Sequence, residues 1–141
     1  IEKWLQEDLV DIMAGSCYFH LEPWSDFAAL GHKYDKPVYA CLSGSRIVSD
    51  KSPEANTDQL RQTWHNEAGD AWRAGVDGIY TFNLFDPKSS LFRELGSLKT
   101  LSNPDPNYEP LAGNQKAMNR WLKDGAKFLD PSLRSLGSTR Q

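Results

Sequence analysis

The sequence lacks the features by which several large classes of protein are recognised. No run approaches the roughly 20 apolar residues that a membrane-spanning helix needs. The 16 Lys and Arg residues are outnumbered by 19 Asp and Glu residues and form no basic stripe, which argues against binding of nucleic acid. The glycine loops that bind phosphates and dinucleotides are absent, and so is the serine elbow of esterases. His20, His32 and His65 form no zinc pattern, so we expect neither a metal nor a cofactor.

Cysteine is also scarce. Cys17 and Cys41 are the only two, which is too few for a disulfide framework. Each lies near the end of a predicted strand, and the favoured interpretation is two small buried side chains. A bridge between neighbouring strands is the weaker alternative.

What remains is a globular composition in which short apolar runs alternate with amphipathic segments. Apolar runs predict strands over residues 9–14, 38–42 and 78–82. Helices are predicted over 1–5, from a Ser25 cap to about residue 34, over 57–74 and over 88–95. The alternation predicts an α/β fold with a parallel sheet. Three strands are too few to bury both faces of such a sheet.

Two segments surround this pattern with polar or proline-rich sequence. Residues 43–58 are polar and predict a long loop, and residues 102–110 predict a proline-rich linker. A helix at about 114–123 follows the linker. The chain therefore divides into a β/α part, 1–101, and a linker with a helical tail, 102–141. It opens within a predicted helix and without a methionine, so we expect further chain upstream.

One segment resembles a known family. Residues 69–83 end in A-G-V-D-G-I-Y-T-F-N, which resembles the last barrel strand of bacterial family-10-like glycosyl hydrolases. Residues 91–96 resemble the closing helix of these barrels, and residues 4–12 resemble the helix that runs into an earlier strand. The resemblance covers about 1–101. It implies the C-terminal β/α units of a parallel (β/α)8 TIM-type barrel, incomplete because a full barrel needs about 250 residues. It also implies action on glycosidic bonds and allows a location outside the cytoplasm.

In such barrels the active site lies at the carboxyl ends of the strands. Glycoside hydrolysis needs two carboxyl groups at the scissile bond, and Glu22, after the first strand, is the best candidate for a catalytic one. His20 and Trp24 lie close to it in the sequence, and a tryptophan can stack on a sugar while its apolar surface raises the pKa of a carboxyl group. The alternative is that Glu22 is an ordinary loop carboxylate and that Trp24 packs on its own helix.

Three further residues are candidates for binding a sugar. Asn83 could hydrogen-bond a hydroxyl group or satisfy backbone groups at the rim. Asp86 could contact substrate, although a capping role before Pro87 is favoured. Arg46 could bind a carboxylated or sulfated sugar, although a solvated arginine is favoured.

The helix at 57–74 should lie on the outside of a barrel, so its polar residues are expected at the surface. His65, Glu67 and Asp70 are therefore assigned surface roles rather than catalysis.

The second strand departs from the usual pattern of retaining glycosidases because it ends in Cys-Leu-Ser-Gly, without a carboxylate. Either the second carboxylate lies upstream or the barrel has lost hydrolytic chemistry. Two hypotheses follow: a glycoside hydrolase-like barrel portion, or a non-catalytic carbohydrate-binding or structural barrel. The expected ligand is a carbohydrate. Because a three-strand fragment would expose apolar strand faces and open edges, we also expect a partner, which is the missing N-terminal portion of the barrel, another chain or a second copy of this one.

Overall fold

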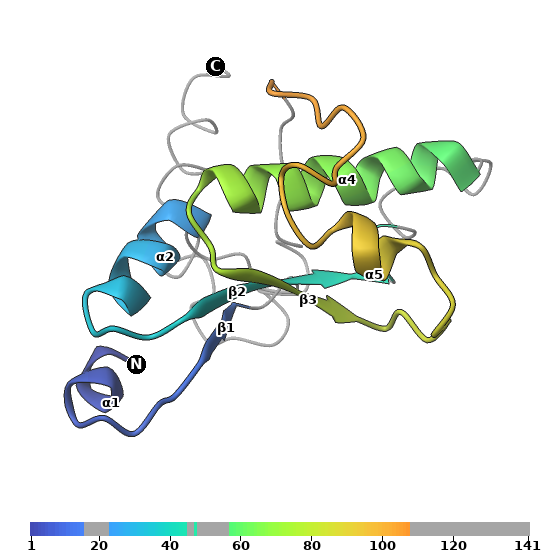
Figure 1. Cartoon of the computed structure of the whole chain (residues 1–141). Helices are drawn as coiled ribbons and strands as arrows, with labels where there is room; N and C mark the ends of the chain where they lie inside the picture. Colours follow the sequence, from blue (N-terminus) through green and yellow to red (C-terminus); the bar gives the residue numbers. More distant parts are fainter. Residues whose placement is uncertain (16–22, 45–46, 48–56, 108–141) are drawn as a thin grey trace, which may run out of the picture.

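The computed structural model describes residues 1–15, 23–44, 47 and 57–107 (Figure 1). Its three strands form one parallel sheet in the order β1-β2-β3, so the predicted β/α alternation is confirmed. The elements are α1 (Glu2–Gln6), β1 (Met13–Gly15), α2 (Trp24–His32), β2 (Val38–Ser43), α4 (Thr57–Arg73), β3 (Gly78–Phe82) and α5 (Leu91–Glu94). The barrel stays a prediction, because three strands form an open sheet.

Helices α2 and α4 lie on the same face of the sheet (Figure 1). Alternate residues of β2 point toward them, and Val38, Ala40 and Leu42 are at most 2% exposed. From the helices, Trp24 and Ala28 of α2 and Trp64, Ala68 and Ala71 of α4 complete the layer. Small side chains on α4 allow the helix to approach the strands closely. The core therefore lies between one face of the sheet and these two helices.

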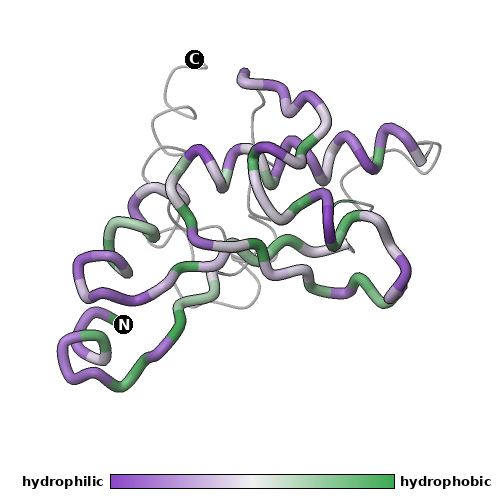
Figure 2. The backbone as a smooth tube through the Cα atoms, in the orientation of Figure 1, coloured by the Kyte–Doolittle hydropathy of each residue, from purple (hydrophilic) through white to green (hydrophobic). Residues whose placement is uncertain are grey.

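The opposite face of the sheet carries Tyr39, Cys41, Tyr80 and Phe82. Cys41 pairs in register with Tyr80, so the two side chains project from the same face. Tyr80 is 50% exposed and Phe82 is 38% exposed. Figure 2 shows that hydrophobic residues occur along the strands. An apolar sheet face thus remains partly open to solvent.

The first strand is shorter than the sequence indicates. A buried strand over 9–14 was expected, but Leu9 is 66% exposed, Ile12 is 57% exposed and β1 begins only at Met13. Asp8 has a φ of 56°, and the amide of Leu9 donates to the carbonyl of Trp4, so residues 8 and 9 still belong to the turn that ends α1. The prediction for residues 9–12 was wrong because an apolar run does not specify where a neighbouring strand begins to pair.

The helix boundaries are confirmed in one case and corrected in two. Helix α4 ends before Gly75, whose φ of 96° is the left-handed geometry that favours glycine after a helix. Helix α2 begins at Trp24, with Pro23 before it and no side-chain cap, so the Ser25 cap was wrong. Helix α5 covers only Leu91–Glu94 rather than 88–95, because residues 86–89 form a separate turn.

The polar face of α4 is the largest correction. His65 is 1% exposed and Glu67 is 8% exposed, whereas both were expected at the surface. α5 and Ser102 cover the side of the helix that carries His65, and Leu101 joins the core. Amphipathic periodicity could not predict this, because the covering segments are neither a sheet nor a long helix.

We predict that Trp64→Ala lowers the free energy of unfolding by about 3–5 kcal/mol, because it removes a large side chain from the contact between α4 and the sheet. Urea unfolding followed by circular dichroism measures this. Trp4→Ala is the matched control, since Trp4 is 57% exposed and its loss should cost less than about 0.5 kcal/mol. Equal losses in the two variants would contradict the assignment of the core.

Candidate functional site

The carboxyl ends of the strands lie along one edge of the sheet, which is where a ligand site is expected in parallel α/β folds. β2 and β3 continue into Gly44 and Asn83. A Cβ atom added to Gly44 would lie 3.1 Å from the carbonyl oxygen of Asn83, so the two backbones approach closely here. Asn83 has a φ of 59°, a conformation that asparagine tolerates better than most residues. The close approach of the backbones therefore explains the glycine at position 44, and the positive φ explains the asparagine at position 83.

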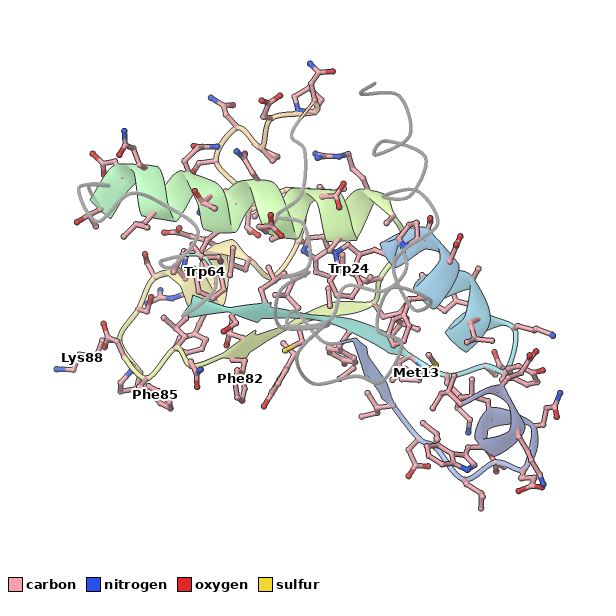
Figure 3. All side chains as sticks on the ribbon, turned by 180° about the vertical axis from the view of Figure 1, so that it is seen from behind. Met13, Trp24, Trp64, Phe82, Phe85 and Lys88 are labelled. Carbon is pink, nitrogen blue, oxygen red and sulfur yellow. The ribbon has the colours of Figure 1, made fainter. Side chains whose placement is uncertain are left out.

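Aromatic side chains dominate the described part of this edge. Phe85 is 86% exposed and follows β3 by three residues, and Phe82 is 38% exposed at the end of the strand. Figure 3 shows both rings on the side of the sheet away from α4. Tyr80 lies two residues earlier on β3 and therefore projects from the same face as Phe82. Exposed rings in such a row offer flat apolar surfaces to a ligand.

Asp86 lies on the turn that follows. Its Oδ1 accepts a hydrogen bond from the amide of Lys88 at 2.9 Å, and its carbonyl oxygen accepts another from the amide of Ser89. The carboxylate therefore stabilises a turn, as Asp residues commonly do, rather than the start of a helix. The predicted N-cap at Asp86 was wrong, because α5 begins only at Leu91 and its N-cap is Ser90.

Trp24 is 5% exposed and lies in the core (Figure 3). A Cβ atom added to Gly15 at the end of β1 would lie 2.6 Å from the Trp24 ring, so the indole packs directly on the strand. Its ring also meets Phe27 edge to face, with 6.3 Å between the centroids. This placement agrees with the packing alternative and leaves little of the indole open for stacking on a sugar.

Of the predicted site residues, the structure brings Asn83 and Asp86 together on one loop and places Trp24 on the helix side of the sheet. Glu22, His20 and Arg46 lie outside the described residues, so their roles stay predictions. Tyr80, Phe82 and Phe85 were not among the predicted site residues. Alternation of aromatic residues at 80 and 82 was the signal that could have identified them.

The carboxylate with the largest pKa shift lies elsewhere, between α4 and α5. Arg61 donates two hydrogen bonds to Glu94, at 2.9 Å and 2.6 Å, and this guanidinium lowers the pKa of Glu94 to about 2, with smaller contributions from Ser90 and His65. At the opposite end of the sheet from the aromatic row, His32 and the amide of Val38 lower the pKa of Asp77. These charges hold elements together and do not belong to the edge described above.

No family model matches the chain, and comparisons with curated proteins and with solved structures give no match. Within residues 1–15, 23–44, 47 and 57–107, no group of His, Cys, Asp and Glu side chains is arranged to hold a metal ion. No helix of this described part is long and apolar enough to cross a membrane.

We predict that Asp86→Ala lowers the free energy of unfolding by about 1 kcal/mol, because it removes the acceptor for the Lys88 amide. Asp86→Asn keeps an acceptor oxygen and should retain most of that stability. Thermal unfolding of the two variants measures the difference. If Asp86→Asn loses as much as Asp86→Ala, the turn bond does not account for this residue.

A second prediction concerns pH. The lowered pKa means that Glu94 contributes stability above about pH 4.5, and that this contribution is lost as pH falls toward 2. Arg61 is about half exposed, so solvent screening weakens the pair, and we expect Glu94→Gln to cost about 2 kcal/mol at pH 7. Urea unfolding between pH 7 and pH 2 should show the difference between wild type and variant shrinking over the acidic range. A constant difference would mean that the charge of Glu94 is not responsible.

Proposed function

We propose that this chain is the C-terminal portion of a (β/α)8 barrel that acts on carbohydrate by carboxylate acid and base chemistry. The observation that carries the proposal is the one-sided burial of a parallel sheet. Helices cover one face, and the other face carries partly exposed Tyr80 and Phe82. Purely parallel sheets are normally buried on both faces. A barrel meets this need because its helices form the outer ring and its inner face is filled by side chains from all strands.

The outer edge of β3 supports the same proposal. Beside it lies a groove of about 230 Å³ whose lining is mainly apolar. Its lining includes Ile79 of β3 together with Trp72, Leu91 and Leu95. No strand in the described ranges pairs with this edge. A further parallel strand, from the N-terminal portion of the barrel or from another chain, would fill the groove and continue the ladder.

Carbohydrate is the ligand class that the carboxyl edge supports best. Sugar rings present apolar C–H faces together with hydroxyl groups, and exposed aromatic rings beside hydrogen-bonding side chains suit both. Phe82 and Phe85 supply the rings, and Asn83 lies between them in the sequence. In the proposal Glu22, which lies in the sequence between β1 and α2, is the proton donor. The second carboxylate would come from the rest of the barrel.

A second candidate function is binding of carbohydrate without hydrolysis. The observation that favours it is that the Asp86 carboxylate is used to hold its own turn. Asp86 is therefore a poor candidate for the second catalytic carboxylate. In this case the aromatic row would hold a glycan and Glu22 would have no chemical role.

The experiment is hydrolysis of a panel of glycosides by the longest natural form of the protein, with three variants alongside. Glu22→Gln should lower kcat by at least about 100-fold if Glu22 donates the proton. Phe85→Ala should raise KM up to about tenfold through the loss of ring contact, with kcat less affected. Trp4→Ala, an exposed tryptophan on α1 at the other end of the sheet, is the control and should leave both constants unchanged.

Turnover that Glu22→Gln abolishes, in a variant with wild-type circular dichroism, would establish the enzyme. Binding of glycans that Phe85→Ala weakens, without turnover on any glycoside, would establish the second candidate. Neither turnover nor binding would overturn both.

A further inference from the structure

Residues 102–105, which we call the strap, lie along α4 on the side away from the sheet (Figure 1). A Cβ atom added to Gly69 would lie 2.7 Å from Cβ of Pro104, so the proline ring packs directly on the helix at its smallest residue. Leu101, just before the strap, is 9% exposed and belongs to the core. Three polar contacts from α4 join the strap, namely Gln62 Nε2 to Asn103 O at 3.0 Å, Asp105 N to Asn66 Oδ1 at 3.0 Å and Arg73 Nη2 to Asp105 O at 3.2 Å.

The fourth polar contact comes from a buried histidine. The ring of His65 is 1% exposed, and its Nδ1 accepts a hydrogen bond from the amide of Ser102 at 2.8 Å. An amide N–H can only donate, so Nδ1 carries no proton. Nε2, which lies 2.7 Å from a carboxylate oxygen of Glu94, must therefore carry the ring proton and donate it. The two contacts together fix the ring as the neutral Nε2–H tautomer.

We propose that His65 is a pH-sensitive latch that holds Ser102, the first residue of the strap, on α4 while the ring is neutral and releases it when the ring is protonated. A proton on Nδ1 would turn the acceptor of the Ser102 amide into a donor, so two N–H groups would face each other. The hydrogen bond to Glu94 needs only the proton on Nε2 and survives the change. Protonation therefore breaks the contact with the strap and keeps the contact with α5.

The charges around the ring act in opposite directions. The negative charge of Glu94 on α5 favours the protonated ring. Arg61 on α4 pairs with the same carboxylate, and its positive charge offsets this effect of Glu94. Burial of the ring disfavours the charge. On the strap itself, the charged residue is Asp105, whose backbone is held by Asn66 and Arg73. The direction of the switch follows from the donor and acceptor pattern and does not depend on which of these effects is larger.

The test is an NMR titration of the whole chain from about pH 8 to about pH 5, the range in which histidines titrate. Ring ¹⁵N shifts should report the Nε2–H tautomer at the upper limit. The protection factor of the Ser102 amide should fall at least about tenfold as the ring titrates, with the same midpoint. Amides of β3 are the internal control and should keep their protection, since the latch does not hold the sheet.

Two variants separate the latch from a general loss of structure. In His65→Asn the side-chain oxygen can take the place of Nδ1, so the Ser102 amide should stay protected throughout the titration. In His65→Gln the amide nitrogen can take the place of Nε2 and the acceptor for Ser102 is lost, so protection should be low at every pH. Circular dichroism checks that both variants are folded. If one variant is unfolded, the other variant and the wild-type titration still test the proposal.

Three results would overturn the proposal. The first is a proton on Nδ1 at the upper pH limit. The second is Ser102 protection that does not change as the ring titrates. The third is loss of protection in β3 at the same midpoint as Ser102, which would indicate unfolding rather than release of the strap.

Discussion

Parallel strands impose the constraint on which this structure depends. Each connection must return to the starting end of the sheet, and here the two connections that contain α2 and α4 both return over the same face. That face becomes a dry core with Val38, Ala40 and Leu42 at its centre. The other face receives no helix from the described chain. Within the described residues the interior is therefore complete on one side of the sheet only, and the proposed function rests on what would cover the other side.

Helix α4 joins these parts because it is buried on two sides. Trp64 and Ala68 face the sheet, whereas His65 faces α5 and the strap. A helix that packs on both sides must satisfy polar groups within its contacts, because water cannot reach them. His65 does so with one acceptor nitrogen and one donor nitrogen. The same bonding that makes a buried histidine acceptable also makes the contact depend on its proton.

The carboxyl edge of the sheet combines rigid and exposed parts. The close approach of Gly44 to the Asn83 carbonyl and the turn held by Asp86 fix the backbone around Phe85. Phe85 is 86% exposed, and the backbone that carries it loses little freedom when a ligand covers the ring. Under the proposed function, this ring would contact a flat apolar surface such as the face of a sugar ring.

The sequence by itself determined the order of strands and helices and the parallel sheet, because apolar periodicity records burial against a regular element. It also determined the end of α4 to within one residue. Only the tertiary structure decided that Trp24 is buried, that residues 9–12 stay outside the sheet and that His65 lies under the strap. These outcomes depend on where segments distant in sequence meet, and a local pattern carries no record of a partner that is itself irregular.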